Sequence, residues 1–182
     1  MIAKDIWQII PWLQINGKPA PYGVLNERSI RATAWIMFAV WFFTMMYTFF
    51  TQDFTILKIV VTTFFFDFLV KVLWWPKYSP IAFLGKKIVS KQKPEYVWAI
   101  QKRFAWTLGL IMSWSVLIIS IFLGIKWALP LVLCGTCLWL MLLESSAWIC
   151  VGCKIYYFLV DKKIIKEPAV RPACPGGSCS LK

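Results

Sequence analysis

The six cysteines of this 182-residue chain are the side chains best suited to chemistry, and they fall into three closely spaced pairs. The pairs are Cys134-Gly-Thr-Cys137, Cys150-Val-Gly-Cys153 and Cys174-Pro-Gly-Gly-Ser-Cys179. Two thiols at positions i and i+3 can cycle between a dithiol and a disulfide, and a thiol pair on a flexible arm can exchange with them. The pattern favours thiol redox or sulfur handling, whether or not the chain is an enzyme, with a candidate site formed by Cys150, Cys153, Cys174 and Cys179.

Other uses of these cysteines stay open. Cysteines in apolar segments often serve only as small packing residues, and this interpretation suits Cys134 and Cys137 best. The second pair and the tail pair could together offer four thiolates to zinc or copper(I), although no metal site is assigned. The chain has no histidine, which excludes bis-histidine haem and any Ser-His or Cys-His catalytic pair. The cofactor, if there is one, is not indicated.

Three charged residues interrupt the apolar runs and form a second group of interest. Asp67 and Lys71 have i, i+4 spacing with the acid first, and Glu144 is expected at a similar depth. Charges inside apolar segments usually face the bundle interior and pair with one another. One interpretation is a structural ion cluster of the three, and the other makes Glu144 a proton acceptor for thiolate formation or transport. We predict that Glu144→Gln lowers stability more than thiol activity.

The elements that position these residues are predicted to be transmembrane helices. Hydrophobic residues make up 60% of the chain, and its mean hydropathy is +0.68. Four apolar runs approach the roughly 20 residues that a helix needs to cross a bilayer. They cover residues 33–50, 54–75, 104–125 and 127–151. The sequence therefore predicts an all-α membrane protein, a four-helix transmembrane bundle over residues 33–160 with short amphipathic interfacial helices.

If residues 128–160 form one straight helix, Cys134 and Cys150 lie roughly 24 Å apart along its axis. One metal ion could not bridge that distance. The same geometry leaves Cys134 and Cys137 toward one membrane face and Cys150 and Cys153 near the other.

The distribution of basic residues predicts the orientation. Lysine and arginine concentrate in the arm 1–32, in the segment between the second and third runs, and in the tail 161–182. Such segments stay in the cytoplasm, so both termini are predicted there, and the formal charge of +12 is attributed to topology and anionic lipid rather than nucleic acid. No cleavable signal peptide is expected. Interfacial helices are predicted within the arm and after Ser79-Pro80, and the proline-rich tail with its cysteine pair is expected to be flexible.

The segments NERSIRATAW (26–35), DFLVKVLWWPKYSPIAFLGKK (67–87) and CVGCKIYYFL (150–159) resemble a family of small bacterial membrane proteins. That family is catalogued as the domain of unknown function numbered 4395, and the resemblance extends over residues 20–160. It implies a four-span fold in the bacterial inner membrane and carries over Cys150 and Cys153 as signature positions. It also implies a cytoplasmic thioredoxin-like or rhodanese-like partner, because members tend to occur beside thioredoxin-like and sulfur-transfer proteins.

Two further functions compete with thiol chemistry. The chain could be an accessory or structural subunit of a larger membrane complex, with its cysteines incidental. It could also be a small-solute or metal permease, for which four spans would need to form a homo-oligomer.

Overall fold

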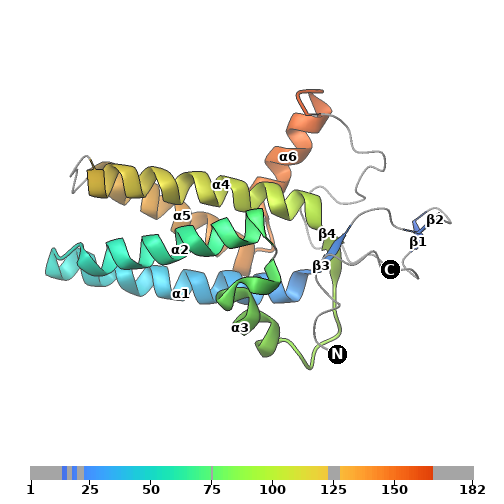
Figure 1. Ribbon diagram of the computed structural model, residues 1–182, viewed down its shortest axis with the longest axis horizontal. Helices are drawn as coiled ribbons and strands as arrows, with labels where there is room; N and C mark the ends of the chain where they lie inside the picture. Colours follow the sequence, from blue (N-terminus) through green and yellow to red (C-terminus); the bar gives the residue numbers. More distant parts are fainter. Residues whose placement is uncertain (1–13, 16–17, 20–22, 75, 123–127, 166–182) are drawn as a thin grey trace.

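The computed structural model describes residues 14–15, 18–19, 23–74, 76–122 and 128–165, and most of these are helical. Four long helices lie side by side along the molecule (Figure 1). They are α1 (Glu27–Thr51), α2 (Thr55–Leu73), α4 (Ala99–Leu117) and α5 (Ala128–Ser146). Helix α2 packs against α1 and α4, and α5 packs against the same two helices, which closes a ring of four. The predicted all-helical class is confirmed.

The core of this ring is apolar and aromatic. Trp41 of α1 stacks on Phe64 of α2 with ring centroids 5.5 Å apart. The Trp41 indole Nε1 donates a hydrogen bond of 2.9 Å to the carbonyl oxygen of Cys134 in α5. A tryptophan thus fills the centre while its polar atom is paired, as a buried indole N–H requires.

The first hairpin forms between the first two apolar runs of the sequence. Asn26 caps the start of α1 by accepting from the Arg28 backbone N–H at 3.1 Å. At the other end Gln52 takes a left-handed φ of 59°, and the Asp53 carboxylate accepts from the Thr55 backbone N–H at 2.9 Å. Helix α1 begins earlier than the predicted span because this cap and the ion pairs of its first turns stabilise its polar start.

Short elements gather at one end of the bundle. Strand β3 (Val24–Asn26) pairs antiparallel with β4 (Tyr96–Trp98), a pairing that the sequence did not predict. Helix α3 (Pro80–Ile88) follows the 3-10 turn η1 (Pro76–Tyr78), and a two-residue pair, β1 (Gln14–Ile15) and β2 (Lys18–Pro19), precedes them in the chain. A π-helical segment, η2 (Ile118–Phe122), continues α4.

Helix α3 confirms the helix predicted after Ser79-Pro80, whereas its location at the membrane interface stays a prediction. The Ser79 hydroxyl accepts from the Ala82 backbone N–H at 3.0 Å, and Pro80 occupies the first turn. Gly85 lets α3 approach α1 closely, since a Cβ at that position would lie 2.8 Å from the Ser29 carbonyl oxygen. The predicted helix in the arm lies outside the described residues.

The fourth predicted span is wrong in its extent. Helix α5 ends at Ser146, and α6 (Val151–Asp161) leaves it at a bend of 93°. Trp148 adopts a left-handed φ of 60°, and the Ala147 and Ile149 backbone N–H groups both bond the Leu143 carbonyl oxygen, at 3.2 and 3.1 Å. These bonds end α5 and redirect the chain, so residues 128–160 do not form one straight helix. The separation of Cys134 and Cys150 expected along a single helix axis therefore does not apply.

Among the described residues, two helical segments are long and apolar enough to cross a membrane, α1 and Ala99–Ser120. The bent pair of α5 and α6 would add a third, as a broken span or a re-entrant loop. Helix α2 carries Lys58, Asp67 and Lys71 within its 19 residues. These charges interrupt it, so α2 lacks the long apolar stretch that makes the other two segments candidate spans. By length and composition, the described part of the chain therefore has two or three candidate spans, and the four-span count remains a prediction.

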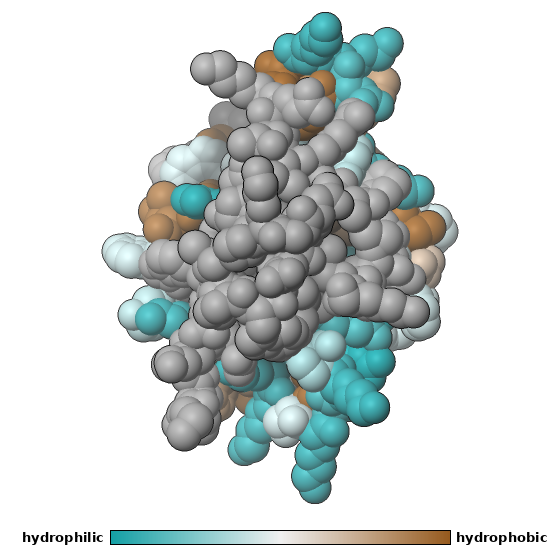
Figure 2. Space-filling view, turned by 90° about the vertical axis from the view of Figure 1, so that its right-hand side faces the viewer, coloured by the Kyte–Doolittle hydropathy of each residue, from teal (hydrophilic) through white to brown (hydrophobic). Residues whose placement is uncertain are grey.

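Hydrophilic surface lies at the end that carries α3. Figure 2 views the molecule from this end and shows hydrophilic side chains in its upper and lower parts. By their place in Figure 1, these parts are the end of α6 above and α3 with the segment after it below.

Candidate functional site

The second cysteine pair lies at the start of α6. Cys150 is the N-cap residue, and its Sγ accepts a hydrogen bond from the Cys153 backbone N–H at 3.4 Å. Only 4% of Cys150 and 1% of Cys153 are exposed, and both are free cysteines. The thiols therefore occupy the first turn of a helix, where backbone N–H groups and the helix dipole favour negative charge.

A glycine within this motif fixes α6 against α4. A Cβ on Gly152 would lie 2.6 Å from the Ala105 Cβ and 2.8 Å from its Cα. Phe104 packs on Tyr156 with ring centroids 5.5 Å apart, further along the same contact. The spacing Cys-Val-Gly-Cys thus combines two thiols with the one residue type that allows this close crossing.

The local geometry also sets the acidity of Cys150, which lies in the break between α5 and α6. A hydrogen bond from the Cys153 thiol lowers the pKa of the Cys150 thiol, and this outweighs the opposing effects of burial and of the Glu144 charge. The Lys102 ammonium and the Cys153 backbone N–H lower it further. The pKa of Cys150 is therefore below its ordinary value, which favours the nucleophilic thiolate.

Lys102 of α4 is the centre of a buried ion cluster near this pair. Its Nζ lies 2.8 Å from the Glu144 Oε1 and 3.9 Å from the Glu27 Oε1. Arg31 extends the cluster, with its Nη2 3.5 Å from the Glu27 carboxylate and 3.2 Å from that of Glu95. The cluster brings together residues from α1, α4 and α5 and the end of the loop before β4.

The expected cluster of Asp67, Lys71 and Glu144 is therefore divided in two. Asp67 does pair with Lys71, and it also accepts a hydrogen bond from the Ser79 hydroxyl. Glu144 pairs with Lys102 instead. The sequence does not indicate Lys102, because this residue precedes the predicted third span, whereas α4 begins at Ala99 and buries it.

The first cavity, which we call the cysteine cavity, has a volume of about 330 Å³. Cys137 and Cys150 both line it, although they belong to different pairs. The rest of its wall comes from α1, α2, α4, α5 and α6 and is mainly apolar, with Glu144 as its charged residue. The bend after Ser146 brings Cys150 to this cavity, an arrangement that a straight fourth helix would not allow.

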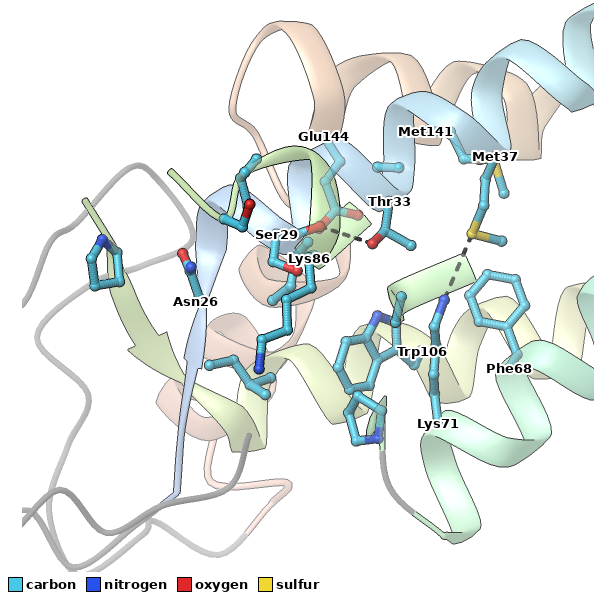
Figure 3. A pocket seen from close by; sticks show the side chains of 18 of the residues that line it. Asn26, Ser29, Thr33, Met37, Phe68, Lys71, Lys86, Trp106, Met141 and Glu144 are labelled. Atoms are coloured by element: carbon cyan, nitrogen blue, oxygen red, sulfur yellow. Dashed lines mark hydrogen bonds between the residues drawn. The ribbon is translucent and has the colours of Figure 1, made fainter. Parts of the chain in front are cut away.

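The second cavity, the lysine cavity, has a volume of about 280 Å³ and lies toward α3. Figure 3 shows Lys71 and Lys86 at its wall, together with Glu144 from α5. Four residues line both cavities and so form their common wall, namely Phe68, Trp106, Met141 and Glu144.

The first cysteine pair has a different environment. Cys134 is fully buried in the aromatic core, and its carbonyl oxygen accepts from Trp41. Cys137 is partly buried at the cysteine cavity. This environment supports the packing interpretation for Cys134.

The tail pair, Cys174 and Cys179, lies outside the described residues, so the proposed exchange between pairs and the four-thiolate alternative remain predictions. Across the ranges that the structure does describe, no group of three or more cysteine, aspartate or glutamate side chains is arranged to hold a metal ion.

Comparison with known families gives a match over most of the chain. The family model described as "Domain of unknown function (DUF4395)" matches residues 25–161, which span most of the chain and both cavities. Neither the curated proteins nor the solved structures include a significant match.

Proposed function

This chain belongs to the DUF4395 family, and we propose that it is a membrane protein that performs dithiol–disulfide chemistry at Cys150 and Cys153. The observation that carries the proposal is the placement of Cys150 as the N-cap of α6, with its sulfur accepting the Cys153 backbone N–H. This geometry stabilises a thiolate on Cys150, and Cys153 is close by as the second thiol of a disulfide.

The two thiols are placed for a reversible disulfide. The Cys150 Sγ lies 3.4 Å from the backbone nitrogen of Cys153, and a disulfide needs the two Cβ atoms about 3.5–4.5 Å apart, so we expect a small shift in the first turn of α6 to be enough. Oxidation joins the two sulfur atoms and passes two electrons and two protons to an acceptor. Reduction by two thiols of a thioredoxin-like partner, or by the tail pair Cys174 and Cys179, would restore the dithiol and leave a disulfide on the donor.

The buried ions support this site by position rather than by direct chemistry. Glu144 lies on the wall of the cysteine cavity, but one of its oxygens is bonded to Lys102 at 2.8 Å. In our proposal Lys102 favours the Cys150 thiolate and Glu144 holds Lys102, which makes both of them positioning residues.

We place the protein in the bacterial inner membrane with both termini in the cytoplasm. The apolar helices support the membrane location, and the basic segments support the cytoplasmic location of both termini.

A redox titration of each cysteine tests the proposed function. The purified chain is equilibrated in dithiothreitol buffers of stepped potential, quenched with a mass-tagged alkylating reagent and analysed by peptide mass spectrometry. We expect Cys150 and Cys153 to change state together at one potential, and Cys150→Ser to abolish the transition. Cys134→Ser is the control and should leave it unchanged.

A single redox state of Cys150 and Cys153 across all potentials would contradict the proposal. It would favour the accessory-subunit alternative, in which the cysteines only pack.

A further inference from the structure

We propose that the cysteine cavity binds a lipid-soluble quinone, which accepts electrons from the Cys150–Cys153 dithiol. This inference rests on the proposed function, since it names the electron acceptor of the same site. The juxtaposition that carries it is an apolar, aromatic-walled cavity of about 330 Å³ with the Cys150 thiol in its wall.

The burial of the thiols determines how an acceptor can reach them. In the reduced state Cys150 is 4% exposed and Cys153 is 1% exposed, so a soluble protein cannot reach the dithiol, and a protein reductant would act only on the disulfide form, in which the first turn of α6 has shifted. Cys150 nevertheless lines the cysteine cavity. A small molecule inside the cavity can therefore contact Cys150 without any rearrangement of α6.

The rim of the cavity indicates the direction of entry. Ile111 of α4 and Ile155 of α6 line the cavity and are 55% and 41% exposed. These exposed members of the cavity lining are apolar, as expected for entry from lipid rather than from water. An acceptor that enters this way must be soluble in the bilayer.

The wall of the cavity favours a flat ring. Four aromatic residues line it, namely Trp41, Phe64, Phe68 and Trp106. Aromatic groups attract one another in offset or edge-to-face contacts, and cavities of about 300–1,000 Å³ are of the size that binds small organic molecules. A quinone head group has the required shape, apolar character and capacity for two electrons.

The reaction balances without a further reactant. The S–H bonds of Cys150 and Cys153 break, one S–S bond forms, and the dithiol loses two electrons and two protons. The quinone gains them, which converts its two carbonyl groups into the two hydroxyl groups of the quinol. One disulfide is formed for each quinone reduced.

The test uses the full chain in lipid nanodiscs, reduced and then mixed with decylubiquinone without oxygen. The ultraviolet absorbance of the quinone reports its reduction, and alkylation with peptide mass spectrometry reports the disulfide. We expect one quinol for each Cys150–Cys153 disulfide, and no quinol from Cys150→Ser.

A pair of variants on α4 locates the reaction. Leu108 lines the cysteine cavity, whereas Leu110 is a half-buried residue of the same helix that lines neither cavity. Leu108→Trp should fill the cavity and slow quinone reduction at least about tenfold, a change of about 1.4 kcal/mol in the barrier. Leu110→Trp should leave the rate within about twofold of the unmodified chain.

The outcomes separate the two proposals. If the dithiothreitol titration forms the disulfide but decylubiquinone is not reduced, or if both tryptophan variants behave alike, the quinone site is wrong while the dithiol function stands. If no disulfide forms at any potential, the proposed function fails and the quinone site fails with it.

Discussion

Cys150 combines two properties that rarely occur at one cysteine, because it is almost fully buried and yet has a lowered pKa. Burial alone would favour the neutral thiol. The Cys153 thiol and backbone N–H both bond the Cys150 sulfur, and the Lys102 ammonium adds its charge. The site thus stabilises negative charge on sulfur within apolar surroundings.

The pH dependence of Cys150 alkylation tests this electrostatic arrangement. Because its pKa is lowered, the thiolate forms at lower pH, and the rate of alkylation should reach half of its maximum below the ordinary value of about 8.5. Lys102→Met removes a charge that lowers the pKa, so the midpoint should move up. Glu144→Gln removes a charge that raises the pKa, so the midpoint should move down.

The opposite signs of these two shifts exclude unfolding as their common cause, because unfolding would raise the midpoint in both variants. Lys154→Met, which removes an exposed lysine of α6, is the control and should leave the midpoint unchanged. Equal midpoints in all three variants would contradict the role of Lys102.

The Lys102–Glu144 pair should matter more for stability than for thiol chemistry. Glu144→Gln leaves buried Lys102 with Glu27 as its acidic neighbour, at 3.9 Å. Loss of one partner of a buried pair costs about 3–5 kcal/mol, so we expect a clear fall in melting temperature in detergent. The extent of Cys150–Cys153 disulfide formation should change little.

The double variant Lys102→Met/Glu144→Gln serves as the control for that prediction. It removes both charges of the pair, so it should recover part of the lost stability despite leaving Glu27 with Arg31. If Glu144→Gln were fully stable but unable to form the disulfide, Glu144 would be a proton acceptor instead of a positioning residue.

At the scale of elements, the close crossing of α6 over α4 positions the cysteine pair. Gly152→Ala would place a Cβ 2.6 Å from that of Ala105, and such overpacking costs about 1–3 kcal/mol. We expect α6 to shift, the melting temperature to fall, and the redox potential of the pair to change. Thermal unfolding together with the dithiothreitol titration measures all three.

The chain offers a matched control for this substitution in its other Cys-x-x-Cys motif. A Cβ at Gly135 would meet no atom within 4 Å. Gly135→Ala should therefore be neutral or stabilising by up to about 1 kcal/mol, because alanine favours the helix more than glycine does. Equal effects of the two substitutions would argue against a positioning role for Gly152.

Much of this arrangement of elements can be predicted from the sequence. The apolar runs predict where α1, α2 and α4 lie, although α1 and α4 begin before their runs, and Ser79-Pro80 predicts the start of α3. The break after Ser146 cannot be predicted in this way. It depends on a left-handed Trp148, a conformation that tryptophan seldom adopts and that no local pattern signals.

The candidate site was predicted only in part for the same reason. Cys150 and Cys153 are visible from their spacing, but the cavity that joins Cys150 with Cys137 exists because the chain turns at residues 147–150. Lys102 was missed because its partners, Glu27 and Glu144, lie 75 and 42 residues away along the chain, and only tertiary packing brings them together.

At the scale of the whole molecule, charge is distributed between two ends. The loop between α1 and α2 lies at one end of the bundle, and β3, β4 and α3 lie at the other (Figure 1). That loop contains Gln52 and Asp53 and no basic residue, whereas the segment after α3 contains Lys91 and Lys93. Lysines near the ends of spans favour the cytoplasmic side, so the second end should face the cytoplasm.

Single-cysteine labelling in intact bacterial cells tests this orientation. In a background with all six native cysteines replaced by serine, Asp53→Cys and Lys93→Cys introduce one exposed thiol at each end. A membrane-impermeant maleimide should label Asp53→Cys in intact cells and Lys93→Cys only after the inner membrane is permeabilised. The reverse pattern would invert the topology, and labelling of both thiols in intact cells would mean that α1 does not cross the membrane between the two ends. The predicted pattern would place the α3 end, and with it the start of α6 and the Cys150–Cys153 pair, near the cytoplasmic face, where a cytoplasmic thiol donor could reduce the disulfide.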